Sequence, residues 1–231
     1  ALTPHVPIRV RELRKEDHVT WYKCSGTPVV CVKLAFCHIL PRKPDLVVSG
    51  INHGSNAAIN VVYSGTMGAT IEGCVQGVPS IGFSLCSHGE DADFTETMRI
   101  VSPIIESVLK NGLPSGVCLN VNVPAVKEVL GVKVCRQANS KWTGDFERAN
   151  DPFGKNIYWL TGEFVNLEPD STDTDIWAIN HGFAAVVPCA IDHTAYPHLI
   201  TTKEMFKESG LLKHETEDSD VLIASQITCN R

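Results

Sequence analysis

The sequence predicts an α/β fold whose core strands run parallel. Two short apolar segments, PDLVVSG at 44–50 and PSIGFSL at 79–85, have the length and composition of buried strands. Between them, GTMGATIEGCVQG at 65–77 places apolar residues at helical spacing and ends on Gly77, a common helix stop. A strand, a helix and a strand in succession form a βαβ unit with parallel strands and a right-handed crossover. With 231 residues and 43% hydrophobic content, the chain can bury a substantial core as one compact unit.

Three further elements are predicted around this unit. TPVVCVKLAFCHIL at 27–40 indicates a buried helix, with Thr as its N-cap and Pro28 at its first position. The segment 93–110 has the pattern of an amphipathic helix, in which Pro103 should cause a kink. After it, GVCLNVNVP at 116–124 alternates apolar and polar residues as a strand does.

The last third of the chain is predicted to hold an arm. Two strand-like segments, 131–138 and 156–166, are separated by a polar stretch with Gly, which favours a hairpin or arm extending from the core. A short helix at 173–182 and a strand at 183–191 should follow, and the polar tail from about residue 198 is not expected to join the core. The expected organisation is a core at 1–130, an arm with its return to the core at 131–200, and a polar tail at 201–231.

Charge and composition argue against several kinds of partner. The chain has 20 basic and 26 acidic side chains and a net charge of −6, which argues against binding duplex nucleic acid or an anionic membrane. No apolar run is long enough for a membrane span, and no basic-then-apolar leader is expected. The nine Cys residues lie scattered in apolar stretches without paired spacing, which is typical of reduced thiols in a cytoplasmic protein. Any bound anion must therefore be held by local groups.

A polar, nearly uncharged loop connects the first strand of the βαβ unit to its helix. In open α/β sheets, ligands bind at this place, beyond the carboxyl ends of the strands. Ser64 should cap the helix, and the N–H groups of Gly65, Thr66 and Met67 are expected among the unpaired donors of the first turn. Together with the helix dipole and the hydroxyls of Ser64 and Thr66, these donors favour a phosphate site.

Two asparagines in the same loop suggest a metal beside the phosphate. Asn52 follows the strand, where its amide oxygen could bind Mg²⁺ or Mn²⁺, and Asn56 lies within reach of the same place. Taken alone, a Ser-Gly-Thr sequence is more often a simple helix cap, and each Asn is more often a turn residue. As a group with Ser64, Gly65 and Thr66, they favour a site for phosphate and metal.

Other polar residues have simpler structural interpretations. A single His flanking a turn, such as His53, is usually a bystander, and the carboxylates that follow His88 are explained by the start of a helix. Thr172 with Asp175 fits another helix start. Three tryptophans could stack a nucleobase or pack the arm, and the sequence leaves both readings open: Trp142, Trp159 and Trp177.

Four segments resemble the SurE family of metal-dependent 5′-nucleotidases, also called survival proteins: KPDLVVSGINHGSN, YSGTMGATIEG, GVPSIGFSL and the upstream YKCSGTPVVCVKLA. The resemblance extends from about residue 15 to about residue 200 and includes NVNVP and TDTDIWAINHGF. It implies a Rossmann-like three-layer αβα sandwich with a mostly parallel sheet and a protruding C-terminal β arm used in homodimers or homotetramers. It also implies hydrolysis of nucleoside 5′-monophosphates, with 3′-nucleotides as a further substrate class, assisted by a divalent cation.

The resemblance assigns roles to the loop residues. Asn52 matches the metal-ligating Asn of the family, and its phosphate-contacting positions fall on Asn56, Ser64, Gly65 and Thr66. The family opens with a strand ending in Asp-Asp-Gly, whose carboxylates hold the metal, followed by a Ser ligand, and neither can be placed in this sequence. The catalytic residues are therefore unknown, and an N-terminal piece is expected to precede a chain that begins without Met. Because the carboxylates are missing, the alternative is a non-catalytic module for nucleotide or phosphate, or an inactive truncated form.

Overall fold

The computed structural model describes residues 2, 5–209 and 211 and divides the chain into two compact units, Ala1–Ile191 and Asp192–Arg231. The first unit contains a five-stranded sheet in the order β3-β4-β5-β11-β6. Strand β4 pairs in parallel with both β3 and β5, whereas β11 is antiparallel to β5 and parallel to β6. The predicted α/β class with a mostly parallel sheet is confirmed. The strands are β3 (Val47–His53), β4 (Ser80–Cys86), β5 (Val117–Pro124), β6 (Val132–Val134) and β11 (Ala184–Ala190).

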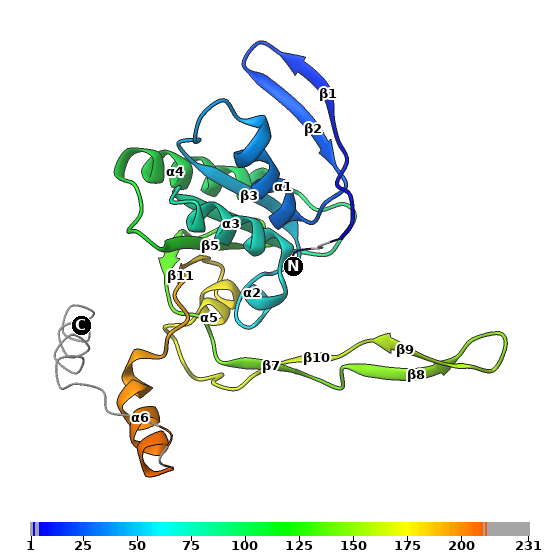
Figure 1. Ribbon diagram of the computed structural model, residues 1–231, viewed down its shortest axis with the longest axis vertical. Helices are drawn as coiled ribbons and strands as arrows, with labels where there is room; N and C mark the ends of the chain where they lie inside the picture. Colours follow the sequence, from blue (N-terminus) through cyan, green and yellow to red (C-terminus); the bar gives the residue numbers. More distant parts are fainter. Residues whose placement is uncertain (1, 3–4, 210, 212–231) are drawn as a thin grey trace. The chain divides into compact units, whose positions relative to one another are not determined.

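Helices cover both faces of this sheet, as the three-layer expectation requires (Figure 1). On one face, Ile81 and Phe83 of β4 pack in a buried cluster with Ile100 of α4. On the other face, Gly82 lies against α3, where a Cβ would come within 2.6 Å of the sulfur of Met67. Strand alternation therefore sends successive β4 residues to different helices. The helices of this unit are α1 (Pro28–Leu34), α2 (Asn60–Tyr63), α3 (Gly65–Val75), α4 (Thr95–Asn111) and α5 (Asp175–Asn180).

Most predicted helices and core strands lie close to their expected positions. The first helix begins at Pro28 after Thr27, and a π-helical turn, η1 (Ala35–Ile39), follows α1. The expectation that this segment is buried is wrong, because neither element contains a buried residue. Helix α3 is stopped by Gly77, which has a φ of +72°. Pro103 lies inside α4, which continues from Thr95 to Asn111. The local signals of cap, spacing and stop were thus sufficient for these elements.

A hairpin precedes the first helix and was not predicted. Strand β1 (Val10–Glu16) pairs antiparallel with β2 (Val19–Cys24). Every residue of β1 is exposed, and no residue of β2 is buried. Because neither face is covered, the sequence carries no alternation of apolar and polar residues that would reveal these strands.

The arm is built differently from the predicted one. Strand β7 (Ser140–Thr143) pairs with β10 (Glu163–Asn166), and β8 (Phe146–Asn150) pairs with β9 (Asn156–Leu160), so that two ladders follow one another along a single ribbon (Figure 1). The expected hairpin between 131–138 and 156–166 is wrong, because the first of these segments contributes β6 to the main sheet, beside β11. The polar stretch itself forms β7 and β8, since a ribbon without a covered face needs no apolar side.

The second unit contains little packed structure among its described residues. A short 3₁₀ turn, η2 (Tyr196–His198), leads into α6 (Leu199–Glu208), and neither element contains a buried residue. Residues 210 and 212–231 of the predicted tail lie outside the described residues.

The composition predicted reduced cysteines and gave no sign of a membrane-spanning segment. All eight cysteines in the described residues are free, and Cys74, Cys118 and Cys135 among them are buried. Across the same part of the chain, no helix combines the length and apolar character that a bilayer crossing requires.

Candidate functional site

The N-terminus of α3 offers hydrogen-bond donors next to an open space. Ser64 caps the helix, because its Oγ accepts a hydrogen bond from the N–H of Met67 at 3.0 Å. The expectation that the N–H of Met67 is unpaired is therefore wrong. The N–H groups of Gly65 and Thr66 have no acceptor in the described part of the chain, as is usual for the first turn of a helix. Gly65 is exposed and Thr66 is half-buried. These donors and the positive end of the helix dipole can hold an anion.

A cavity of about 440 Å³ lies beside this helix start. Its volume is in the range of pockets that hold small ligands. Of the five residues selected from the sequence, Asn56 and Ser64 line it, whereas Gly65, Thr66 and Asn52 do not. The cavity is lined by residues of the loop, of α2 and of the arm. They include Ser55, Asn56, Asn60, Tyr63, Ser64 and Trp142.

Asn56 is buried and held from three sides by the carboxyl ends of the strands. Its N–H donates to Oδ1 of Asn122 at 2.8 Å, and its carbonyl accepts from Nδ2 of Asn120 at 2.9 Å. Its own Nδ2 donates to the hydroxyl of Ser84 on β4. Asn56 therefore anchors the loop to the sheet, and much of its amide is already engaged in that anchoring.

The contribution of β5 to the site was not predicted from the sequence. Asn120 and Asn122 are buried in β5 and lie two positions apart, so they point to the same face of the sheet. Nδ2 of Asn122 donates to Oδ1 of Asn120 at 3.0 Å, which orients both amides toward the loop. The signal was present in NVNVP, because two Asn residues at strand spacing inside an apolar strand require buried partners.

Asn52 lies within β3, next to its last residue, rather than after the strand as expected, and its amide nitrogen turns into the loop. Nδ2 donates to the carbonyls of His53 at 3.0 Å and Gly54 at 2.9 Å, with a longer contact of 3.5 Å to Oδ1 of Asn56. Its Oδ1 accepts no hydrogen bond from the described residues, so this oxygen is available to a ligand. Within those residues no group of three His, Cys, Asp or Glu side chains is placed to hold a metal ion. One neutral oxygen does not fit a complete site for Mg²⁺ or Mn²⁺.

Asp175 holds the loop from the opposite side. Its side chain is fully buried, and its carboxylate accepts from the N–H of Ala58 at 2.7 Å, of Ala138 at 2.9 Å and of Ile176 at 2.8 Å. Burial raises the pKa of this carboxyl, and the three N–H donors oppose the rise. The expected pairing with Thr172 at the helix start is wrong, because Thr174 caps α5 by accepting from the N–H of Trp177.

Both histidines near the loop pack against neighbouring residues. His53 makes an edge-on contact with Phe94, with 5.1 Å between ring centroids. His88 lines the cavity and packs on Gly54, whose φ of +95° suits glycine and where a Cβ would come within 2.2 Å of the imidazole. Any larger residue at position 54 would clash with the imidazole of His88, so the loop needs glycine here.

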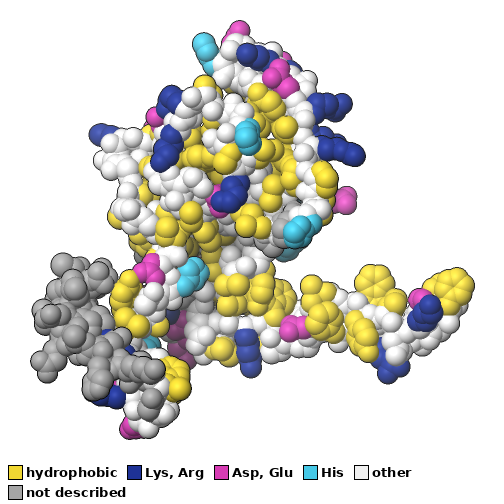
Figure 2. Space-filling model, viewed as in Figure 1, with side chains coloured by type: hydrophobic (Ala, Val, Ile, Leu, Met, Phe, Trp, Pro, Cys, Tyr) yellow, Lys and Arg dark blue, Asp and Glu magenta, His cyan; other side chains and the backbone are white. Residues whose placement is uncertain are grey.

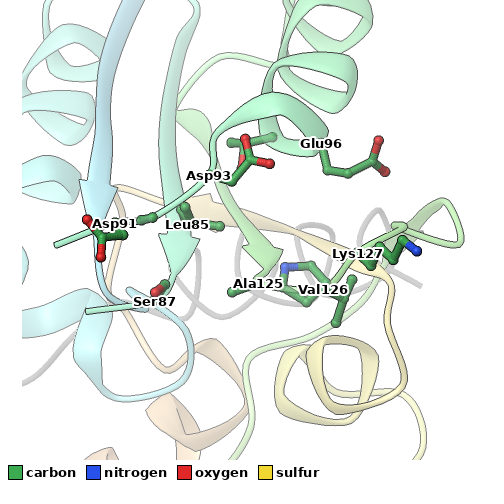
Figure 3. Close-up of a pocket in the computed structure, with 11 residues that line it drawn as sticks. Leu85, Ser87, Asp91, Asp93, Glu96, Ala125, Val126 and Lys127 are labelled. Carbon is green, nitrogen blue, oxygen red and sulfur yellow. The ribbon is translucent and has the colours of Figure 1, made fainter. Parts of the chain in front are cut away.

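A second cavity, of about 360 Å³, lies at the start of α4 (Figure 3). Asp93 serves the start of the helix, as the sequence suggested, because it accepts from the N–H of Thr95 at 2.8 Å. Glu96 of α4 instead accepts from the N–H of Val129, outside the helix, at 2.9 Å. These hydrogen bonds, together with that of Arg99 to Glu96, lower the pKa of both carboxyls. The hydroxyl oxygen of Thr97 is buried in this region without a hydrogen-bond partner among the described residues.

Comparison with known proteins identifies the family. The family model for "Survival protein SurE" matches residues 1–144. A 5′-nucleotidase SurE of Phocaeicola vulgatus is 51% identical over 196 residues, which cover 85% of this chain and 76% of that protein. The corresponding protein of Bacteroides fragilis is 50% identical over 196 residues, covering 85% and 77%. The crystal structure of the SurE protein from Aquifex aeolicus superposes with a TM-score of 0.74 at 35% identity, covering 89% of this chain and 82% of that one. The chain therefore belongs to the SurE family.

Proposed function

We propose that this protein is a 5′-nucleotidase that hydrolyses nucleoside 5′-monophosphates, and 3′-nucleotides as a further class, to a nucleoside and phosphate. The observation that supports this most directly is the start of α3, where the cap Ser64 lines a cavity of about 440 Å³ and the N–H groups of the next two residues, Gly65 and Thr66, have no acceptor among the described residues. The relatives that bear the name 5′-nucleotidase SurE, at about 50% identity over most of the chain, support the activity. A non-catalytic binding module is not favoured by these names.

Each residue of the proposed phosphate site has a distinct part. The N–H groups of Gly65 and Thr66 donate to phosphate oxygens, and the hydroxyl of Thr66 adds a donor. The Oγ of Ser64 accepts from the N–H of Met67, so its own proton is free to be donated to the phosphate. Asn56 contacts the phosphate from the loop and keeps that loop in place through Asn122. Preorganised donors of this kind favour the charge that develops on a phosphoryl group.

A divalent cation, Mg²⁺ or Mn²⁺, is part of the proposal, with Oδ1 of Asn52 as one ligand. The side chains of the described residues do not fit the complete coordination sphere, since no acidic cluster is close enough to share the ion. Hard cations of this kind bind through carboxylates and substrate phosphates as well as amides. We therefore assign no step of the reaction to the metal.

The arm is proposed to mediate self-association as a homodimer or homotetramer in the cytoplasm. Large hydrophobic side chains stand out along it, as the yellow groups on the extended ribbon in Figure 2 illustrate. Exposed apolar side chains gathered on one element commonly mark a protein interface. The most exposed of them are Phe146, Phe153, Tyr158, Trp159 and Leu160, at 61–88%.

Phosphate release from adenosine monophosphate in the presence of Mn²⁺ tests the function. The assay is run on the full-length protein, with and without a chelator. We expect phosphate release that depends on Mn²⁺ and is lost with the chelator. No turnover in the presence of Mn²⁺ would reject the proposal. Turnover that survives the chelator would reject the divalent cation as its cofactor.

A further inference from the structure

We infer that Tyr63 and Trp142 bind the base of the nucleotide by stacking, so that the arm contributes directly to substrate recognition. The inference rests on the proposed function and deepens it, because it gives the other end of the substrate a place. It also decides between the two interpretations that the sequence left open for Trp142, a nucleobase platform or simple packing of the arm.

The space beside the phosphate site continues toward the arm. The cavity of about 440 Å³ that contains Asn56 and Ser64 is also lined by Asn60, Tyr63 and Trp142. The same three residues line a neighbouring cavity of about 610 Å³, which is otherwise formed by arm residues such as Phe146 and Leu160. A nucleoside monophosphate has its phosphate at one end and its base at the other. With the phosphate at the start of α3, the base therefore extends into space bordered by Tyr63 and Trp142.

The ring of Trp142 is fixed before any ligand arrives. Its Nε1 donates to Oδ1 of Asn60 at 2.8 Å, which links the arm to α2 across 82 positions of the sequence. Its indole also meets Phe164 edge-on, with 5.9 Å between centroids and 73° between ring planes. The side chain is nevertheless 39% exposed. A ring held at its nitrogen and its edge, with surface still free, loses little conformational entropy when a base stacks on it.

Tyr63 is coupled to the phosphate site through the backbone. It is the last residue of α2 and directly precedes the cap Ser64, whose N–H donates to the carbonyl of Asn60 at 3.0 Å. Its side chain is 72% exposed in the absence of ligand. Asn60 therefore connects both aromatic residues, since its side chain holds Trp142 and its carbonyl fixes the turn that carries Tyr63.

The other two tryptophans are unsuited to this role. Trp177 stacks on His181, with 3.8 Å between centroids and 14° between planes, and the amine of Lys133 lies 4.0 Å from its ring. Trp159 belongs to β9 and lines neither of the two cavities. Base stacking accepts every nucleobase, because each base has a π face. The site should therefore bind nucleotides in preference to other phosphate esters, with weak discrimination among bases.

The test compares two ligands that differ only in the base. Adenosine monophosphate and ribose 5-phosphate share the phosphate and the ribose, and calorimetry measures the binding of each. Loss of one stacking partner should weaken adenosine monophosphate binding about tenfold in Trp142→Ala and in Tyr63→Ala, with ribose 5-phosphate unchanged. Trp142→Phe and Tyr63→Phe keep an aromatic face and should retain most of the affinity. Trp177→Ala, at a tryptophan that lines neither cavity, should leave both ligands unaffected.

Three outcomes would overturn the inference. Wild-type protein that binds adenosine monophosphate no more tightly than ribose 5-phosphate would exclude a base subsite while leaving the phosphatase proposal intact. An equal loss for both ligands in Trp142→Ala would mean that the tryptophan shapes the phosphate site instead. Wild-type protein that binds neither ligand would reject the proposed function itself. A thermal melt of each variant by circular dichroism separates loss of binding from loss of fold.

Discussion

The carboxylate of Asp175 accepts a hydrogen bond from the backbone N–H of Ala58 at 2.7 Å, across 117 positions of the sequence. The same carboxylate accepts from Ala138, just before the arm begins. One buried side chain thus ties together the loop after β3, the base of the arm and the start of α5. The position of the loop relative to the start of α3 depends on this link.

Replacement of Asp175 by Asn should destabilise the fold and loosen the loop. An amide has one acceptor oxygen and presents an NH₂ group to a backbone donor, so at least one hydrogen bond to a charged acceptor is lost, at about 1.5–3 kcal/mol. Urea unfolding should show this loss. The exposed Asp170→Asn serves as the matched control and should unfold as wild type does. Equal stability of Asp175→Asn and wild type would contradict the anchoring role.

Thr66→Ala should weaken the binding of phosphate and nucleotide without a comparable loss of stability. The hydroxyl is one donor at the helix start, and removal of such a donor costs about 1–3 kcal/mol of binding free energy. Thr66→Ser keeps the hydroxyl and should bind as wild type does. Isothermal titration measures both variants, and wild-type affinity in Thr66→Ala would exclude the hydroxyl from the site.

Acid should weaken the joint where the arm returns to the core. The carboxylate of Glu168 accepts hydrogen bonds from both terminal nitrogens of Arg136, at 2.7 Å and 2.8 Å. This pairing lowers the pKa of Glu168 from an ordinary 4.5 to about 2. A carboxyl with a depressed pKa in the folded state stabilises the fold above its unfolded pKa and loses that contribution as the pH falls. The stability difference between wild type and Glu168→Gln should therefore shrink between pH 4.5 and about 2. Thermal melts across this window measure it, and a constant difference would disprove the linkage.

Light scattering should report a dimer or a larger assembly. The arm exposes Phe153 at 88% and Tyr158 at 61%, and such surface is usually buried by a partner. The double variant Phe153→Ser with Tyr158→Ser should shift the population toward monomer without changing the melting temperature of the core. A strictly monomeric wild-type chain at about tens of micromolar, a range that detects weak complexes, would count against an assembly arm.

Sequence alone was sufficient wherever structure depends on near neighbours. The βαβ unit at 44–85, the cap Ser64 and the stop at Gly77 follow from spacing, hydroxyl chemistry and glycine's left-handed backbone. The selection of Asn56 and Ser64 for one site was likewise possible, because a loop after a parallel strand must lead to the carboxyl edge of the sheet. The family resemblance added the roles that are proposed for these residues.

Tertiary structure decided what depends on distant partners or on uncovered surface. The hairpin β1–β2 and the strands β7 and β8 have no buried face, so their pairing leaves no apolar alternation in the sequence. The anchoring of Asn56 by Asn122 spans 66 positions, and the role of Asp175 spans 117. A buried polar side chain must find hydrogen-bond partners, but its identity does not say which ones. Only the folded chain determines that choice, because the partners are fixed by how the strands and helices pack together.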